Sequence, residues 1–446
     1  MAFLMFVILI MLTLISYFLG KRSLMSPWFL LCLMFLATFS VVLINYNKWA
    51  VSINEYFVLY VTSALLAFGG GCLVVQALKR PCKAPNNVNA TELRKSFIIK
   101  TKYPVNIFLV ISAIFTSIYI VKLILDAGIS SSFTSVLRRI YEMQSGEHYS
   151  PGFIFNQFRE VVVAIAYLNV FRLFIRIYAR EDKISIVKLI VPVFLFLVLI
   201  LISTERNLFL RFAIYTVSIW VFIYGKNLHC KNANLKIVIR AALLLAVIVL
   251  IFFLLGVAKQ YKSSFFDQFS IYSASGLNNF NVWLKDFDGQ LLYGKSTFTT
   301  FLSSLSEILS LINVKLNATV NQIDPFIDYV TPDGYHYYSN IFSAFKPYVE
   351  DFGYLGVIVF PFTVGLFYQW LYVKAERKNF SLSWIIYCML IYSVIYFPIL
   401  EQLFRRFHLG FIYEIVWITL LYYLVLGRKK SKVVKGRTSA QIKGAQ

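Results

Sequence analysis

Long apolar blocks alternate with short polar segments along nearly the whole chain. Each block holds about twenty mainly apolar residues, which is the length that a helix needs to cross a hydrocarbon core of about 30 Å. Backbone groups in lipid must pair within their own segment, so each block is predicted to be a helix. The pattern predicts an all-α polytopic membrane protein with about eleven spans, at 2–19, 27–47, 56–78, 104–125, 153–178, 184–203, 208–225, 236–257, 352–373, 381–400 and 411–427.

Two details of this pattern bear on the architecture. Only four residues, 204–207, separate the sixth and seventh spans, so these spans form either a tight helical hairpin or two broken half-helices. The first span lacks a basic segment before it and a small-residue cleavage pattern after it, so it is expected to be a retained anchor. The predicted organisation is eight helices in 1–257, a large loop over 258–350, three helices in 351–427 and a basic tail over 428–446.

Composition and charge agree with this class and orient it. Only 14% of the 446 residues are charged and 59% are hydrophobic, whereas a soluble domain carries roughly 25% charged residues. Most of the 43 Lys and Arg lie in alternate connecting segments, which the positive-inside rule places in the cytoplasm. We therefore expect a multi-pass protein of the bacterial cytoplasmic (inner) membrane, with its N-terminus outside, its C-terminus inside and the 258–350 loop outside. Basic residues that hold the connecting loops in the cytoplasm explain the net charge of +22, so no nucleic-acid partner is expected.

Cysteine and histidine give no sign of a metal site. Three cysteines lie in predicted spans and two in predicted cytoplasmic loops, so the external loop has no disulfide. No CxxC or His-x-x-x-His spacing occurs, and the four histidines are scattered. We expect neither a protein metal site nor a cofactor.

The external loop, at 258–350, is long enough to suggest a function. Apolar residues recur at helical spacing over 298–316, opposite a hydroxyl-rich face, which predicts a helix that lies in the membrane interface or packs on its own domain. A polar, aromatic segment around His336 follows. Its carboxylates and aromatic rings suit sugar binding, but they also suit any loop at a membrane interface.

Charged residues gather near the predicted outer ends of several spans. Ionisable groups at such depths are costly and tend to be functional, although interfacial anchoring or ion pairing explains any single one equally well. Arginine is the natural ligand for a diphosphate because it is always charged and binds in a bidentate manner. The residues concerned are Arg159, Glu160, Glu205, Arg206, Arg211, Glu350, Asp351, Glu401, Arg405, Arg406, His408 and Glu414.

Three stretches resemble the bacterial O-antigen and capsule repeat-unit polymerases, often called Wzy-type. The first is Ser203-Thr-Glu-Arg-Asn207, between two apolar runs. The second is Tyr272 to Phe298, where Gly276-Leu-Asn-Asn-Phe280 leads to Gly294-Lys-Ser-Thr-Phe298 before a predicted helix. The third is Asn340 to Gly365, and its pattern Tyr348-Val-Glu-Asp-Phe-Gly-Tyr-Leu-Gly356 is the most specific of the three. The resemblance implies a membrane glycosyltransferase fold of the GT-C-like type.

The resemblance also implies a reaction. A glycan on undecaprenyl diphosphate is moved onto the non-reducing sugar of a new lipid-linked repeat unit, beside membrane lipid and with a possible chain-length regulator protein as partner. Such a site needs cations for the departing diphosphate and a base for the attacking hydroxyl. Asp351 is the candidate base, or it caps the span that follows it. The full candidate set is Asp351, Arg206, Glu350 and His336 for catalysis, and Arg405, Arg406, Arg159, Lys259, Tyr261 and Glu401 for substrate binding.

Two alternatives remain open. An O-antigen ligase would use a catalytic histidine in the large loop, and His336 is available for that role. A lipid-linked oligosaccharide flippase would show two similar halves with short external loops, and we find no internal repeat.

Overall fold

The computed structural model describes residues 1–78, 105–128, 132–145, 149–179, 183–225, 265–310, 326–330, 336–377 and 381–426. Within these ranges the chain is mostly helical, and seven helices are long and apolar enough to cross a membrane. Two shorter apolar helices and the charged helix α7 accompany them. The class expected from the sequence, an all-α membrane protein, is confirmed at this level.

The predicted spans coincide with helices wherever the structure describes them, with ends that differ by a few residues at most positions. The eighth predicted span, 236–257, lies outside the described residues, as do Lys259 and Tyr261. The helices are α1 (Ala2–Leu19), α2 (Pro27–Ile44), α3 (Glu55–Ala77), α5 (Val105–Ala127), α7 (Phe153–Ala179), α8 (Lys183–Ser203), α9 (Arg206–Gly225), α13 (Phe345–Arg377), α14 (Leu382–Tyr396) and α15 (Leu409–Leu426).

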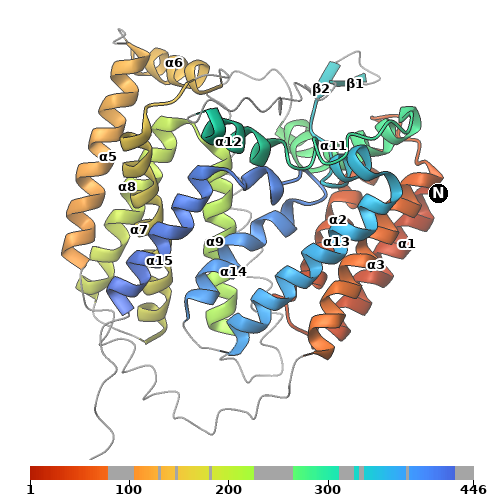
Figure 1. Cartoon of the computed structure of the whole chain (residues 1–446), viewed down its shortest axis with the longest axis horizontal. Coiled ribbons are helices and arrows are strands. Elements are labelled where there is room, and N and C mark those ends of the chain that lie inside the picture. Colours follow the sequence, from red (N-terminus) through yellow and green to blue (C-terminus); the bar gives the residue numbers. More distant parts are fainter. Residues whose placement is uncertain are drawn as a thin grey trace, which may run out of the picture.

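The helices form two groups joined by α14 (Figure 1). One group holds α1, α2, α3 and α13, and the other holds α5, α7, α8 and α15. Helix α14 contacts α2 and α13 of the first group, α7 and α15 of the second, and α9. Its side chains from Tyr387 to Val394 are all buried, as expected for a central helix that is apolar on every side.

Glycines set the close packing of α3 against α13. A Cβ atom on Gly365 would lie 2.2 Å from the carbonyl oxygen of Phe68, and one on Gly71 would lie 2.2 Å from that of Phe362. Neither position leaves room for a side chain, so the two backbones are in direct contact. Small residues serve this purpose between membrane helices, where van der Waals packing replaces the hydrophobic effect.

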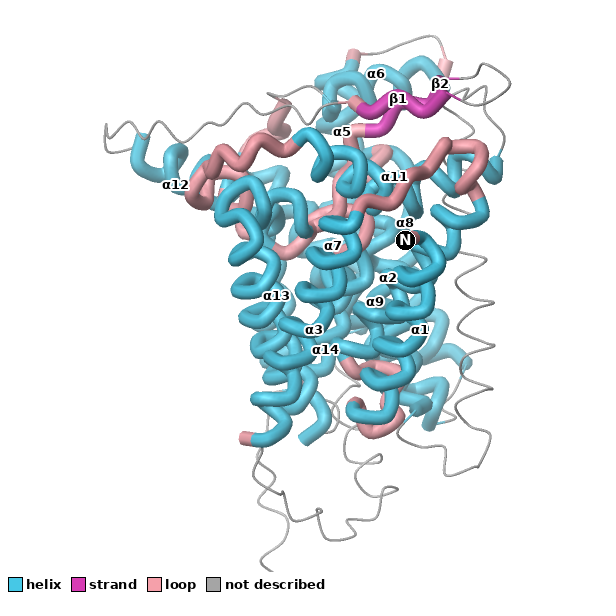
Figure 2. Tube along the Cα trace, turned by 90° about the vertical axis from the view of Figure 1, so that its right-hand side faces the viewer, coloured by secondary structure: helices cyan, strands magenta, loops and turns pink. Residues whose placement is uncertain are grey.

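Four elements that lie outside the main bundle gather at one end of it (Figures 1 and 2). They are α6 (Phe133–Ser145), α11 (Phe265–Asp286), α12 (Thr299–Ser310) and an antiparallel hairpin of β1 (Ile327–Val330) and β2 (His336–Ser339). Helix α12 matches the first part of the helix predicted over 298–316, and residues 311–316 lie outside the described ranges. Helices α6 and α11 and the hairpin were not predicted from the sequence.

Helix α11 shows that the segment predicted as one long loop is partly built into the bundle. It packs on α2 and α3. Asn281 accepts a hydrogen bond from the backbone of Asn54 and donates one to Ser52 O, at 2.9 and 3.0 Å. A Cβ on Gly276 would lie 2.2 Å from the carbonyl oxygen of Ile399, so α11 also touches the turn after α14.

Helix α13 begins at Phe345, before the start of the predicted span at residue 352, and it contains a kink. Gly353 has φ 58° and ψ −144°, a backbone conformation that favours glycine, and it divides a short first segment from the long second one. Just beyond the kink, a Cβ on Gly356 would lie 2.0 Å from Tyr348 O. The third sequence motif therefore encodes a bent helix entry.

Candidate functional site

A cluster of charged side chains lies at the same end of the bundle as α11 and α12. It is formed where α7, α9 and α15 begin and where the connection between α14 and α15 crosses the bundle, including the 3-10 turn η1 (Phe404–Arg406). We call it the arginine cluster. Its members are Arg159, Glu160, Glu205, Arg206, Arg211, Arg405, Arg406, His408 and Glu414.

The turn between α8 and α9 supplies one side of this cluster. Helix α8 ends at Ser203 and α9 begins at Arg206, with Thr204 at φ 55°, so the first motif is a tight helical hairpin rather than two broken half-helices. Glu205 accepts a hydrogen bond from Arg159 Nε at 3.0 Å and a second from Arg159 Nη2. The remaining nitrogen, Arg159 Nη1, donates to Glu160 at 2.6 Å. Arg159 is thus largely neutralised by its two carboxylates.

Arg406 is held differently. Its Nη2 donates to Glu414 at 3.0 Å, and its guanidinium carbon lies 4.4 Å from the ring centre of Phe411. Both charged side chains are 5% exposed. Within the described part of the chain, Arg406 Nε and Nη1 and Glu414 Oε1 have no hydrogen-bond partner. Two guanidinium nitrogens are therefore buried without an acceptor from the part of the chain that the structure describes.

Arg211 adds a second cation at this point. It interacts electrostatically with Glu160, Arg406 and His408, and its Nε is likewise buried without an acceptor among the described residues. Partial burial, with Arg211 and Arg406 next, lowers the pKa of His408 below its usual value. Buried donors in native proteins are nearly always paired. The unpaired nitrogens of Arg211 and Arg406 mark a place where an anion fits.

Arg206 and Arg405 complete the cationic side. Arg206 is the first residue of α9 and is half-buried, and Arg405 is exposed. Arg206 directly follows Glu205, the partner of Arg159, and Arg405 directly precedes Arg406 in η1, so both are chain neighbours of the ion-paired residues.

Glu401 builds the turn that carries Arg405 and Arg406. Its carboxylate accepts hydrogen bonds from the backbone N–H groups of Leu403, Phe404 and Arg405, at 2.8, 2.9 and 2.9 Å. Burial raises the pKa of Glu401, and the three N–H groups counteract this rise. Tyr348 also donates to Glu401, at 3.5 Å. In the structure, the carboxylate of Glu401, which was predicted to bind substrate, holds this turn in place.

Asp351 and Glu350 are fully engaged in joining two motifs. The Asp351 carboxylate accepts the backbone N–H groups of Ser296 and Thr297, at 3.0 and 2.6 Å. Glu350 accepts the Ser296 hydroxyl at 2.6 Å and pairs with Lys346 at 2.5 Å. Asp351 therefore caps the turn before α12 and not its own helix. Both carboxylates fasten the Gly294–Phe298 motif to the Tyr348–Gly356 motif.

Aromatic rings link this junction to the arginine cluster. Phe298, just before α12, lies 5.3 Å from Phe404 of η1, and Tyr348 stacks on Phe360 at 4.9 Å. Phe404 also contacts Tyr348 and Phe360, at 6.0 and 5.7 Å between ring centres. Helix α12 therefore packs directly on the turn that carries Arg405 and Arg406.

His336 stands apart from this cluster. It lies on strand β2, where Nδ1 is 2.7 Å from Asp328 and the ring stacks on Tyr338. The hairpin is fastened to α11, because Tyr329 donates to Asn279 and receives a hydrogen bond from Asn278. Burial raises the pKa of Tyr329, so its hydroxyl stays neutral in this network.

The sequence analysis did not identify Tyr167 and Tyr392, which face the cluster from α7 and α14. Both interact electrostatically with Arg211 and Arg406. Tyrosines are common throughout this chain, so composition and spacing contain no signal that separates these two. Among the described residues no group of three or more His, Cys, Asp or Glu is arranged to hold a metal ion.

Searches against protein families, curated proteins and solved structures found no match for this chain.

Proposed function

We propose that the chain is a membrane glycosyltransferase that polymerises undecaprenyl-diphosphate-linked repeat units into an O-antigen or capsule polysaccharide. The supporting observation is that the buried Arg406 and the half-buried Arg211 have buried nitrogens without an acceptor among the described residues, an arrangement that suits an anion. A diphosphate supplies several acceptor oxygens and negative charge, which is the chemistry that arginine binds best. Arg206 and Arg405 add cations at the rim of the same site.

Charge balance favours a leaving group over a permanent ion pair. Glu160 and Glu205 are occupied by Arg159, and Glu401 by the backbone of its own turn. Glu414 forms the ion pair with Arg406, and the neighbouring Arg211, which also interacts with Glu160, adds a second positive charge beside that pair. Such a site stabilises a diphosphate as its charge develops, which lowers the barrier to its departure.

The proposed step forms one C–O bond at the anomeric carbon and breaks another. A hydroxyl of the acceptor's terminal sugar forms a C–O bond to the anomeric carbon of the donor glycan. The bond from that carbon to the diphosphate oxygen breaks, and its electron pair leaves with the lipid diphosphate. The hydroxyl proton passes to a carboxylate. We assign this role to Glu414, whose Oε1 has no donor among the described residues, in place of Asp351, whose two oxygens are occupied.

The polymerase assignment also draws support from the three motifs. The second and third are joined through Asp351, and aromatic contacts link them to the turn with Arg405 and Arg406. The first motif forms the α8–α9 turn in the same cluster. The reaction would take place on the outer face of the bacterial cytoplasmic membrane, with a chain-length regulator as a possible partner.

A chromosomal deletion, complemented with the wild-type gene, distinguishes the three candidate functions. Loss of a polymerase leaves a single repeat unit on the final acceptor, which gel electrophoresis of the surface glycan resolves. Loss of a ligase leaves the acceptor bare, with long chains still attached to the lipid carrier. Loss of a flippase leaves lipid-linked units on the cytoplasmic face. Either of the last two patterns would disprove the polymerase assignment.

The ligase alternative depends on His336. Its position on a hairpin anchored to α11 does not bring it into the arginine cluster, where the diphosphate would bind. We therefore expect that a His336→Ala variant still restores long-chain polysaccharide to the deletion strain, whereas a ligase would lose its activity.

A further inference from the structure

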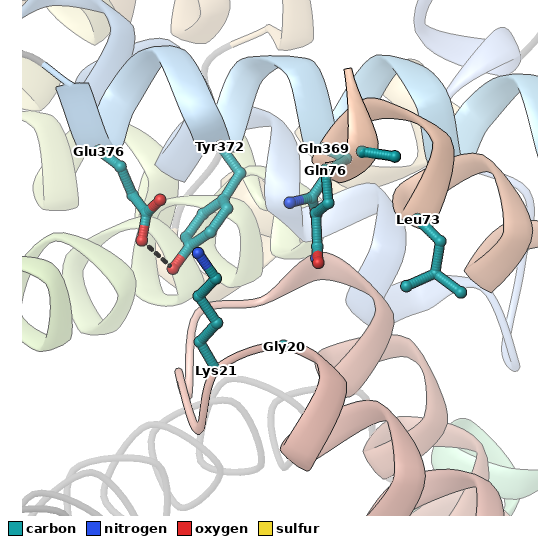
Figure 3. A pocket seen from close by; sticks show the side chains of 8 residues that line it. Gly20, Lys21, Leu73, Gln76, Gln369, Tyr372 and Glu376 are labelled. Carbon is teal, nitrogen blue, oxygen red and sulfur yellow. Dashed lines mark hydrogen bonds between the residues drawn. The ribbon is translucent and has the colours of Figure 1, made fainter. Parts of the chain in front are cut away.

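A cavity with several polar side chains in its lining lies at the end of the bundle opposite to the arginine cluster. Its volume is about 410 Å³, and it lies where α1, α3 and α13 end (Figure 3). The lining residues are Gly20, Lys21, Leu73, Gln76, Ala77, Gln369, Tyr372 and Glu376.

The cavity is a built feature. The glycine contacts hold α3 and α13 together at Phe68–Gly71 and Phe362–Gly365. One helical turn further on, the two helices carry the longer side chains Gln76 and Gln369, which face the cavity instead of the partner backbone. Lys21, at φ 58° in the turn after α1, reaches toward Tyr372 and Glu376 from a third side (Figure 3).

Gln369 supplies the observation that points to a ligand. Its side chain is 2% exposed, yet Oε1 has no hydrogen-bond donor among the described residues. A buried amide oxygen left without a donor costs about 1–3 kcal/mol, so an occupant with an N–H or O–H group is favoured there. Nearby, the Tyr372 hydroxyl is already used, because it donates to Glu376 at 2.8 Å and its oxygen accepts the hydroxyl of Ser23 at 2.7 Å.

The lining also carries one charge of each sign. The Lys21 ammonium attracts a phosphate, while the Glu376 carboxylate attracts a cation and disfavours a second negative charge. A zwitterion therefore matches the cavity better than an anion does. The cavity lies at the ends of membrane-spanning helices, which is the level of the lipid headgroups.

We propose that this cavity binds the phosphoethanolamine headgroup of a membrane glycerophospholipid. The phosphate lies against Lys21, and the primary ammonium donates hydrogen bonds to Gln369 Oε1 and Glu376. A choline headgroup has the same charges but no N–H group, so it cannot satisfy Gln369. A glycerol headgroup can donate hydroxyl hydrogens, but it is a net anion and meets Glu376. This site is independent of the proposed transferase activity.

Native mass spectrometry of the purified full-length protein, titrated with each lipid in detergent, tests the proposal. We expect phosphatidylethanolamine to bind about tenfold more tightly than phosphatidylcholine or phosphatidylglycerol of the same acyl chains. Free phosphoethanolamine should compete only weakly, because it lacks the acyl chains. Equal binding of the ethanolamine and choline lipids, or stronger binding of the glycerol lipid, would overturn the proposal. Full competition by free phosphoethanolamine would instead identify a soluble ligand and overturn the lipid assignment.

Variants separate the two halves of the headgroup. Gln369→Met keeps the side-chain length but removes the acceptor, so the preference for ethanolamine over choline should disappear. Lys21→Met should weaken both lipids alike, by removing the phosphate contact. Arg22→Met is the matched control, because the adjacent exposed Arg22 does not line the cavity. Thermal unfolding of each variant checks the fold. An unchanged preference in Gln369→Met, or equal losses in Lys21→Met and Arg22→Met, would contradict the assignment.

Discussion

Two groups of buried charged side chains lie at the same end of the bundle. Around Glu350 and Asp351, every carboxylate oxygen has a partner from Lys346, Ser296 or Thr297. Around Arg406 and Glu414, only one hydrogen bond joins the pair, and Arg211 beside them also keeps a buried nitrogen without an acceptor in the described part of the chain.

The comparison distinguishes fold from function. A buried charge with all its hydrogen bonds made contributes to the structure, because removing its partners would leave it stranded. A buried charge with unmade hydrogen bonds raises the energy of the empty protein and is retained where a ligand completes it. By this criterion we propose a structural role for Asp351 and a ligand-binding role for Arg406.

The largest expected effect is on activity at Arg406. Arg406→Met alone leaves Glu414 buried and uncompensated, a loss of about 3–5 kcal/mol that would confuse function with folding. The double variant Arg406→Met, Glu414→Gln removes both charges together. We expect it to accumulate near the wild-type level, yet to form polymer at least about 100-fold more slowly, since the donor to the developing charge and the proposed base are both lost. The rate is measured with lipid-linked repeat units and purified protein.

Arg138→Met is the control for that experiment. Arg138 pairs with Glu142 on α6, where the two side chains are 80% and 56% exposed, so its removal should leave the rate unchanged. Wild-type polymer formation by the double variant would show that the arginine cluster is not the diphosphate site.

The next effect is on stability at Asp351. Asp351→Asn replaces one acceptor oxygen with an amide that faces a backbone N–H, so we expect a loss of about 3 kcal/mol of unfolding free energy. The variant should unfold at a lower temperature in detergent, while the activity of the protein that remains folded stays near wild type. The milder variant Ser296→Ala removes only a hydroxyl to Glu350 and should lose less. A stable but inactive Asp351→Asn protein would restore Asp351 as the base.

The sequence predicted the bundle well for a physical reason. Spans such as 2–19 and 56–78 are set by local length and hydrophobicity, and these decide whether a segment forms a helix in lipid. Helix α11 was not expected because its buried face mixes apolar residues with Ser and Asn, including Asn279 and Asn281, whose partners come from distant segments.

The site was predictable only in part for a related reason. The sequence indicated that Arg159, Arg206 and Arg406 lie near helix ends on one side, which brings them to one level of the bundle. Whether a charge is satisfied depends on partners far along the chain. Thr297 lies fifty-four positions before Asp351, and no spacing rule connects them. The roles of Asp351 and Glu401 could therefore be assigned only once the packing was known.

The smallest effect concerns pH at His408. Its pKa is lowered in the folded protein by partial burial and by Arg211 and Arg406, although Glu414 opposes this. In the unfolded chain the pKa of His408 is about 6.5, so as the pH falls the unfolded chain takes up the proton before the folded protein does. The contribution of neutral His408 to the free energy of unfolding is fully present above that pH. It falls as the pH drops toward the lowered pKa of the folded state.

The test is the difference between wild type and His408→Asn. His408 Nδ1 accepts the backbone N–H of Phe411 at 3.3 Å, and asparagine supplies a similar cap without a titrating group. The unfolding temperature of the wild type should therefore fall more steeply than that of the variant between pH 7 and 5, roughly the window around the two pKa values. Parallel curves would mean that His408 does not sense the cluster. In that case the surroundings of Arg406 would carry less excess positive charge than its unpaired nitrogens suggest. The contrast between Arg406 and Asp351 would then be weaker.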